Sequence, residues 1–353
     1  MDVLYLINYA GNGGSEKYVK TLATNLLERG GHPYLGYNQS GQLSTDLENL
    51  NIPTLQLTMR HPFDIKAARQ LANYCYLHEI TTIHTQFARE NYIAIIAKTL
   101  GGAQNIIYTA HINLPNNIPW KLTNLLFTRR NNAIIAVCES VKTLLIKNKY
   151  PKNKIQVIFN GVEHTETTPQ TTINNKKTFV TLARLSEEKG LMFLLKAINI
   201  FIKQSEDNAP NFHMNIAGDG PQKQQLQAYI NENNLQDHIT LLGHVTDTRA
   251  LLANSYAFIN SSSSEALSFA VLEAMAQGLP IIVTNVGGNV DIINHGKCGI
   301  SVGYNNVDDM INAIKTLISD ENLYQEYKKN TPIAIRDVFN IDITLQKTFA
   351  LYR

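Results

Sequence analysis

The feature of this 353-residue chain that most constrains its fold is an alternation of short apolar runs with longer amphipathic stretches. In the first half, the pattern predicts strands at residues 3–8, 82–84, 105–109 and 133–137, and helices at 16–29, 65–78, 92–100 and 140–147. Strands that alternate with helices form a parallel sheet covered on both faces. The first half therefore predicts a doubly wound α/β domain.

A Thr- and Asn-rich segment at residues 163–177 interrupts the alternation, which then restarts. The second half predicts strands at 179–183, 212–217, 239–242, 257–260 and 281–284, and helices at 191–203, 222–233, 270–277 and 307–318. Polar segments with few large apolar groups are typical of linkers. We therefore expect an N-terminal domain over residues 1–162, a linker over 163–177 and a C-terminal domain over 178–334.

Composition excludes several classes of protein. Apolar residues make up 44% of the chain, charged residues 17%, and the net charge is +2, which argues against disorder and against nucleic-acid binding through bulk positive charge. Apolar runs stay well below the ~18 residues that a membrane span needs, and the first residues predict a strand rather than a signal peptide. Cys75, Cys138 and Cys298 are widely spaced and predict buried thiols in a reducing cytosol. We expect a cytoplasmic protein.

Charge is unevenly distributed. Residues 1–163 contain 16 Lys and Arg against 10 Asp and Glu, whereas the rest contains 15 against 19. Two basic stretches account for this excess: Trp120, Lys121, Leu125, Leu126, Phe127, Arg129 and Arg130 in the first, and Lys142, Lys147, Lys149, Lys152 and Lys154 in the second. In one interpretation Leu125 and Leu126 are core residues and the lysines are solvated. In the other, the first domain rests on an anionic membrane leaflet, to which surface cations are attracted.

The loops after the strands are the expected place for a ligand, because doubly wound sheets bind ligands outside the carboxyl ends of their strands. The strand at 257–260 is followed by Glu265 in a loop and by a helix that begins near Ser268 and carries Glu273. The two carboxylates therefore lie on either side of a helix start.

The amides of Ser268, Phe269 and Ala270 at that helix start predict an anion site. With carboxylates nearby to accept hydroxyl groups, the arrangement suits a sugar nucleotide. The alternative is structural: Ser262 and Glu265 would form a capping box, and Glu273 would be a solvated helix residue.

The same segment resembles the signature of glycosyltransferase family 4, retaining enzymes of the GT-B architecture. The matching pattern is Glu265, seven residues, Glu273, then Ala-Met-Ala-x-Gly-x-Pro and the pair Gly287-Gly288. The resemblance implies two Rossmann-like doubly wound parallel-sheet domains that face a central cleft. It also implies that Glu265 contacts the donor sugar, that Glu273 contacts the ribose, and that a final helix at about 335–353 packs back on the first domain. Ser268 and Ala266 stand where the family usually has glycine.

Residues 183–190 resemble the family loop Gly-Arg-Leu…Lys-Gly, which implies that Arg184 and Lys189 hold the donor diphosphate. Two fixed cations stabilise the charge that grows on a leaving diphosphate. Since the chain has no Asp-x-Asp motif, we expect no metal and no other cofactor. The alternative is that both cations pair with Glu187 or Glu188 at the surface.

Other matches to the family are weaker. Asn160, Gly218 and Gly220 lie in matching turns that conformation alone explains. In the loop after 239–242, the resemblance implies that backbone atoms near His244 and Val245 read the nucleobase.

In the first half, Gly14, with Asn12 and Gly13 as lesser candidates, lies in a turn that borders the reaction centre in the family. His111 ends a strand at a position where the family often has a His near the donor sugar. The candidates to face the acceptor are His84, Gln86 and Arg89.

The resemblance implies a metal-independent retaining hexosyl- or N-acetylhexosaminyltransferase. It would use a nucleotide-diphosphate sugar, which is most often UDP-linked in this family, and a glycan or lipid-linked acceptor, in the synthesis of a cell-surface polysaccharide or glycolipid. We expect no nucleic-acid partner and consider contact with the inner face of the membrane. Two alternatives stay open: a catalytically silent sugar-nucleotide-binding subunit, and a GT-B sugar phosphorylase.

Overall fold

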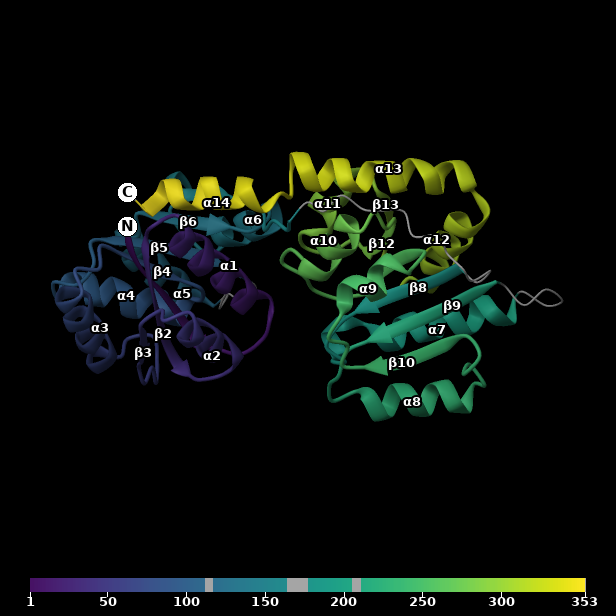
Figure 1. Cartoon of the computed structure of the whole chain (residues 1–353), viewed down its shortest axis with the longest axis horizontal. Helices are drawn as coiled ribbons and strands as arrows, with labels where there is room; N and C mark the ends of the chain where they lie inside the picture. The colour runs from purple at the N-terminus through teal and green to yellow at the C-terminus, as the bar shows by residue number, and fades with distance from the viewer. Residues whose placement is uncertain (112–116, 164–176, 205–210, 353) are drawn as a thin grey trace. The chain divides into compact units, whose positions relative to one another are not determined.

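The computed structural model describes residues 1–111, 117–163, 177–204 and 211–352, and it divides into two compact units (Figure 1). The first unit comprises Met1–Asn160 and Asp342–Arg353, and the second comprises Gly161–Ile341. Val162 belongs to the second unit because its N–H donates to the carbonyl of Phe339 over 2.9 Å and its carbonyl accepts from Ile341 over 3.0 Å. Apart from Glu163 and Lys177 at its ends, the expected linker lies outside the described residues.

The first unit contains seven strands and the helices between them. They are β1 (Asp2–Tyr9), α1 (Gly14–Glu28), β2 (His32–Gln39), α2 (Gln42–Asn49), β3 (Thr54–Gln56), α3 (Ile65–Leu77), β4 (Thr82–Thr85), α4 (Ala88–Thr99), β5 (Asn105–Ala110), α5 (Ile118–Phe127), β6 (Ala133–Ala136), α6 (Glu139–Lys147), β7 (Ile155–Val157) and, after the second unit, α14 (Ile341–Phe349). Short 3₁₀ helices cover Thr128–Arg130, Lys152–Lys154 and Ala350–Tyr352.

All seven strands of the first unit are parallel, in the order β3-β2-β1-β4-β5-β6-β7. The order reverses between β1 and β4, so the loops after these two strands begin side by side. One face of the sheet, including Leu4 and Leu6, packs against α3 and α4. On the other face, Tyr5 lies near Tyr352, whose hydroxyl is 3.4 Å from that of Tyr5.

The second unit contains six strands. Its elements are β8 (Lys177–Leu182), the 3₁₀ helix Glu187–Lys189, α7 (Leu191–Lys203), β9 (Phe212–Ala217), α8 (Lys223–Glu232), β10 (Ile239–Gly243), α9 (Thr248–Ala253), β11 (Ala257–Asn260), α10 (Phe269–Ala276), β12 (Ile281–Thr284), α11 (Asn289–Gly296), β13 (Gly299–Val302), α12 (Val307–Ser319) and α13 (Glu321–Asp337).

The second sheet is also all-parallel, in the order β10-β9-β8-β11-β12-β13, and reverses between β8 and β11. Phe179, Phe212 and Ile216 pack with α7, α8 and α12 in one buried cluster. Helices α10 and α11 pack against α13. The prediction of two doubly wound parallel-sheet domains is confirmed.

Four strands, β2, β3, β7 and β13, were not predicted. β3, β7 and β13 contain only three or four residues and lie at sheet edges. In β2, Pro33 and Gly36 argue against an inner strand, but Pro33 precedes the part of β2 that pairs with β3, which begins at Leu35. The proline is therefore tolerated.

The expected final helix over 335–353 is wrong as a single element. Helix α13 runs to Asp337 within the second unit, and a separate helix, α14, starts at Ile341. Only residues from Asp342 onward belong to the first unit, where the hydroxyl of Thr344 donates to the carbonyl of Phe159 over 2.8 Å. None of the described helices is long and apolar enough to cross a membrane.

The interpretation of His84 as an acceptor-facing residue is also wrong. Its side chain is fully buried, with Nδ1 2.6 Å from the Tyr352 hydroxyl and Nε2 2.7 Å from the Thr109 hydroxyl. Burial lowers the pKa of His84 to about 3. The imidazole is therefore neutral and ties the last residues of the chain to the first sheet.

This histidine predicts a loss of stability in mild acid. Because the pKa of His84 falls from 6.5 in the unfolded chain to about 3 in the folded one, its stabilising contribution is complete above pH 6.5 and is lost as the pH falls. Between pH 7 and pH 5 we expect a loss of about 2 kcal/mol in unfolding free energy. Urea titrations followed by the fluorescence of Trp120, the only tryptophan, report on the first unit.

The control is His84→Gln, which keeps a polar side chain but cannot titrate. Its pH dependence should be smaller than that of the wild type by that amount. A residual dependence is expected from His111, because burial lowers its pKa to about 4. Identical pH dependence in the variant and the wild type would contradict the assignment.

Candidate functional site

The candidate site of the second unit lies where its strand order reverses. Because β8 and β11 pair with each other, the loops that follow them, residues 183–190 and 261–268, lie side by side. Lys189 in the first loop and Glu265 in the second form an ion pair, with Nζ 2.7 Å from Oε1. The Glu265 side chain is 9% exposed and that of Lys189 is 25% exposed. The structure thus brings together two of the predicted site residues.

Two further side chains hold the same carboxylate. The Ser262 hydroxyl donates to Oε1 of Glu265 over 2.7 Å, and the amide of Asn260 donates to it over 3.2 Å. All three bonds reach Oε1, and Oε2 accepts no hydrogen bond from the described residues. One oxygen therefore fixes the orientation of the carboxylate, while the other remains able to accept a ligand hydroxyl.

Backbone contacts join the two loops. The Ser261 hydroxyl donates to the Lys189 carbonyl over 2.9 Å, and the Ser263 N–H donates to the Glu188 carbonyl over 2.8 Å. The loops therefore form one unit, and the ion pair does not depend on long flexible side chains alone.

The capping-box interpretation of Ser262 and Glu265 is wrong. No helix begins at Ser262; α10 starts at Phe269, with Ser268 as its N-cap residue. The bond between Ser262 and Glu265 is a side-chain contact within a loop. The surface-pair alternative for Lys189 is wrong as well, because its partner is Glu265 rather than Glu187 or Glu188.

The pair Gly287-Gly288 supports the main chain of the Glu265 loop. Gly287 has φ of +52°, and a Cβ at this residue would lie 1.7 Å from the Glu265 carbonyl oxygen. The N–H of Gly288 donates to the Ala266 carbonyl over 2.6 Å. Only glycine combines this backbone conformation with so close an approach.

Arg184 is exposed, and its guanidinium forms no hydrogen bond or ion pair with the described residues. Its neighbours are nevertheless fixed: the N–H of Leu185 donates to the Asp219 carbonyl over 2.9 Å, and the Leu185 carbonyl accepts from Gln222 over 2.9 Å. Glu188 does not neutralise Arg184 by direct contact, since its carboxylate accepts from the Ser186 hydroxyl over 2.6 Å. That bond, more than the nearby cations, lowers the pKa of Glu188. Arg184 thus presents a positive charge on a rigid loop.

Helix α10 carries the remaining candidates of the second unit. Ser268 is buried at its N-cap, and Phe269 and Ala270 form its first turn, where the amides have no acceptor within the helix itself. Glu273 lies one turn further along and is partly exposed. Val245 follows β10 in a different loop and is also partly exposed.

The candidates of the first unit lie at the carboxyl edge of its own sheet. Gly14 is the exposed first residue of α1, and Gly13 is its N-cap. His111 follows β5, and its Nε2 is 3.1 Å from Oε1 of Gln86. Because burial lowers the pKa of His111 to about 4, the ring is neutral at pH 7. Gln86 is fully buried and orients this ring.

Arg89 is partly buried rather than open to solvent. Its guanidinium donates to Oδ1 of Asn8 over 3.0 Å and to the Met59 carbonyl over 3.4 Å. It therefore joins the start of α4 to the end of β1 and to the loop after β3.

Sequence reasoning missed Asn260 and Ser262 as residues that hold Glu265. The available signal was their position: Asn260 is the last residue of β11 and Ser262 lies two residues further on. Among the described residues, no cluster of three or more His, Cys, Asp or Glu side chains is arranged to hold a metal ion. Cys75, Cys138 and Cys298 are buried, as predicted, and are not joined in disulfides.

Comparisons with family models match nearly the whole chain. A model described as Glycosyl transferases group 1 matches residues 163–333, and one described as Glycosyltransferase Family 4 matches residues 12–166. The boundary between the two matches lies close to the boundary between the two units.

Two curated relatives align with most of the chain. UDP-Gal:alpha-D-GlcNAc-diphosphoundecaprenol alpha-1,3-galactosyltransferase of Escherichia coli is 26% identical over 339 residues, covering 89% of this chain and 87% of the relative. N-acetyl-alpha-D-glucosaminyl L-malate synthase of Bacillus anthracis is 22% identical over 307 residues, covering 82% and 79%.

Among solved structures, HepE of Anabaena in complex with UDP superposes with a TM-score of 0.86, covering 99% of both chains at 20% identity. The same protein in complex with UDP-glucose gives a TM-score of 0.82, at 20% identity over 99% of this chain and 98% of HepE. At this identity the similarity shows a shared fold.

The glycine pair predicts a sharp difference between two alanine variants. Gly30→Ala places a Cβ in open space at φ of +76°, so backbone strain alone should cost about 1–2 kcal/mol. Gly287→Ala adds a clash with a main-chain carbonyl, which no side-chain rotation relieves. We expect Gly287→Ala to lower the melting temperature more than Gly30→Ala does. We also expect faster hydrogen exchange in residues 261–268 of Gly287→Ala, but not in those residues of Gly30→Ala. Equal exchange in both variants would refute this role.

Proposed function

Because the chain belongs to glycosyltransferase family 4 and has the GT-B fold, we propose that it transfers a sugar from UDP to a glycan or lipid-linked acceptor, with retention of anomeric configuration. The observation that carries this proposal is the Lys189–Glu265 pair beside the unpaired Arg184, where the second sheet reverses its strand order. The proposed donor class is supported by the UDP and UDP-glucose complexes of HepE and by the UDP-linked donor in the name of the Escherichia coli relative.

Arg184 and Lys189 would bind the donor diphosphate. Negative charge accumulates on the leaving diphosphate as the glycosidic bond breaks, and cations on rigid loops stabilise that charge without reorganisation. The first-turn amides of α10 would add hydrogen bonds to a phosphate oxygen. In this proposal the two cations replace a metal ion.

The carboxylates would bind hydroxyl groups of the donor. Oε2 of Glu265 is oriented by the three bonds to Oε1, so it would accept from a hydroxyl of the sugar. Glu273, one turn into α10, would accept from the ribose. Backbone atoms near His244 and Val245 would contact the base.

The first unit would bind the acceptor, with Gly14 allowing close approach of the α1 N-terminus to the diphosphate. His111 would contact the donor sugar as a neutral imidazole, since its pKa is about 4. No candidate residue is placed as a covalent nucleophile. We therefore assign attack on the face that the diphosphate leaves, with the departing phosphate accepting the acceptor proton.

The lipid-linked acceptor in the name of the Escherichia coli relative supports a role in cell-surface polysaccharide or glycolipid synthesis. For this chain we propose a cytoplasmic location with peripheral contact at the inner face of the membrane.

Purified protein incubated with a panel of UDP-hexoses and UDP-N-acetylhexosamines should release UDP from one donor in the presence of acceptor. EDTA should leave the rate unchanged, and NMR coupling constants of the product should show the donor's anomeric configuration. Donor binding without turnover would indicate a silent subunit. Phosphate-dependent formation of a sugar phosphate would indicate a phosphorylase.

Arg184→Ala and Glu273→Ala should each lower donor turnover by roughly 10²-fold or more, because each removes a charged partner of the donor. Lys196→Ala on α7 and Glu232→Ala on α8 are the matched controls, since they remove the same charges elsewhere in the second unit. All four variants should show wild-type circular dichroism. Full turnover in Arg184→Ala and Glu273→Ala would eliminate this site assignment.

A further inference from the structure

Helix α5 in the first unit leaves an apolar stripe exposed, whereas an ordinary surface helix buries its apolar stripe. Trp120 and Phe127 of α5 face inward, with their ring centroids 5.7 and 5.8 Å from that of Tyr92. The side toward the protein carries Asn124, which is 2% exposed, accepts from the Tyr92 hydroxyl and donates to the Asn148 carbonyl over 2.8 Å. The side toward solvent carries Ile118, Leu122 and Leu126, which are 74%, 58% and 64% exposed.

Leu125, which is 38% exposed, extends the same stripe. The interpretation of Leu125 and Leu126 as core residues is therefore wrong. Asn124 and Thr128, four residues apart and so on one side of the helix, are buried instead. The buried polar residues are satisfied by hydrogen bonds, so the outward orientation of the leucines is fixed. We call this exposed surface, Ile118, Leu122, Leu125 and Leu126, the α5 face.

The sequence on both sides of α5 carries an excess of positive charge. Residues 91–162 contain nine Lys and Arg side chains and a single acid, Glu139. That acid is already paired with Lys142 over 3.0 Å. Arg129 and Arg130 directly follow the apolar stripe and are both exposed.

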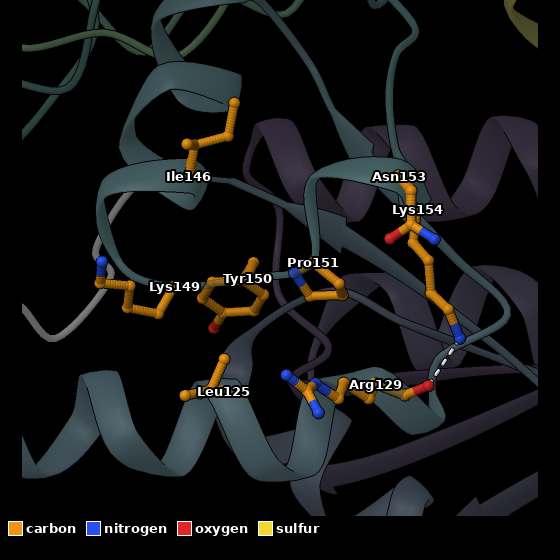
Figure 2. A pocket seen from close by; sticks show the side chains of 8 residues that line it. All are labelled: Leu125, Arg129, Ile146, Lys149, Tyr150, Pro151, Asn153 and Lys154. Carbon is orange, nitrogen blue, oxygen red and sulfur yellow. Dashed lines mark hydrogen bonds between the residues drawn. The ribbon is translucent and has the colours of Figure 1, made fainter.

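A hollow of about 510 Å³ lies beside the end of α5 (Figure 2). Leu125, Ile146, Tyr150 and Pro151 provide apolar walls, and Arg129 and Lys149 add positive charge. A second hollow, of about 500 Å³, lies near Leu126 and Arg130.

Lys154 also lines the first hollow but has a structural role. Its ammonium group donates to the carbonyls of Arg129 and Asn131, each over 2.6 Å, and Figure 2 shows the bond to Arg129. It thereby fixes the end of α5 and leaves the guanidinium of Arg129 beside the apolar walls.

We propose that the α5 face binds the surface of an anionic lipid bilayer, with its leucines at the level of the first acyl carbons and with Arg129 and Lys149 on lipid phosphates. Apolar side chains flanked by cations are the chemistry that holds a helix in the interfacial plane. A second copy of this chain fits less well, because two such faces would bring like charges together. A nucleic acid would match the cations and leave the leucines unused.

This inference deepens the proposed function, since a lipid-linked acceptor would be reached from the same surface. It is tested without donor or acceptor, so vesicle binding and sugar transfer succeed or fail separately.

The experiment is flotation of the full chain with two kinds of vesicle: phosphatidylcholine alone, and phosphatidylcholine with about 30% phosphatidylglycerol. The buffer contains about 0.1 M NaCl, at which electrostatic screening is moderate. We expect binding to the anionic vesicles only, and its loss at about 0.5 M NaCl. Trp120, the only tryptophan, lies on α5. Its fluorescence should therefore be quenched by brominated acyl chains in the anionic vesicles.

Two double variants remove the proposed contacts: Leu122→Ser with Leu126→Ser, and Arg129→Gln with Lys149→Gln. Their matched controls change exposed residues on α3 of the same unit: Ile65→Ser with Leu77→Ser, and Lys66→Gln with Arg69→Gln. The leucine double variant and the Arg129/Lys149 double variant should each bind anionic vesicles at least roughly tenfold more weakly, whereas the controls should bind as the wild type does.

Three results would overturn the proposal: no binding of the wild type to anionic vesicles, wild-type binding by the leucine variant, or equal weakening by the α3 controls. Light scattering adds a fourth. A wild-type dimer that the leucine substitutions convert to a monomer would assign the α5 face to self-association instead.

Discussion

The hydrogen bonds to the carboxylate of Glu265 hold together the two loops of the candidate site in the second unit. Three donors fix this carboxylate through one oxygen: Lys189 from the loop after β8, and Asn260 and Ser262 from β11 and its loop. These donors meet only because β8 and β11 are neighbours where the strand order reverses. The glycine at residue 287 lets a third loop approach the carbonyl of Glu265. Topology, backbone conformation and charge therefore position a single oxygen, Oε2.

The sheet of the first unit also reverses its strand order, but the groups at its carboxyl edge carry different charges. There the carboxyl edge carries the contact of Arg89 with Asn8 and the His111–Gln86 pair. Burial keeps His111 neutral, and it raises the pKa of the fully buried Glu90 to about 7. The first unit thus offers polar groups that are mostly uncharged at this edge, whereas the second offers an ion pair and an unpaired cation. The proposed acceptor site in the first unit and the proposed diphosphate site in the second would therefore differ in charge.

Much of the fold was predictable because periodicity reports burial directly. The core strands, such as β1, β5 and β12, are continuous apolar runs, and they were found. β2 was missed because Pro33 and Gly36 are unfavourable in an inner strand. The proline is tolerated only because pairing with β3 begins after it, at Leu35, which the sequence does not show. At the site, the motifs named Arg184, Lys189, Glu265 and Glu273 as candidates, and the structure pairs Lys189 with Glu265. The motifs did not indicate that Ser262 binds Glu265 rather than capping a helix. Of the two interpretations left open for Leu125 and Leu126, the core interpretation is wrong for a related reason. Apolar residues are expected inside, and only the structure shows that Asn124 takes an inward position on α5 while these leucines are exposed.

The central claim, that the paired loops of the second unit hold a pyrophosphate-bridged ligand, is tested most directly by isothermal titration calorimetry with UDP and uridine. The wild type should bind UDP far more tightly than uridine. Arg184→Ala should weaken UDP binding by roughly 10–100-fold, as the loss of a charge-assisted contact predicts, and should leave uridine binding unchanged. Equal affinity for UDP and uridine in the wild type, or equal weakening of both in the variant, would contradict the account.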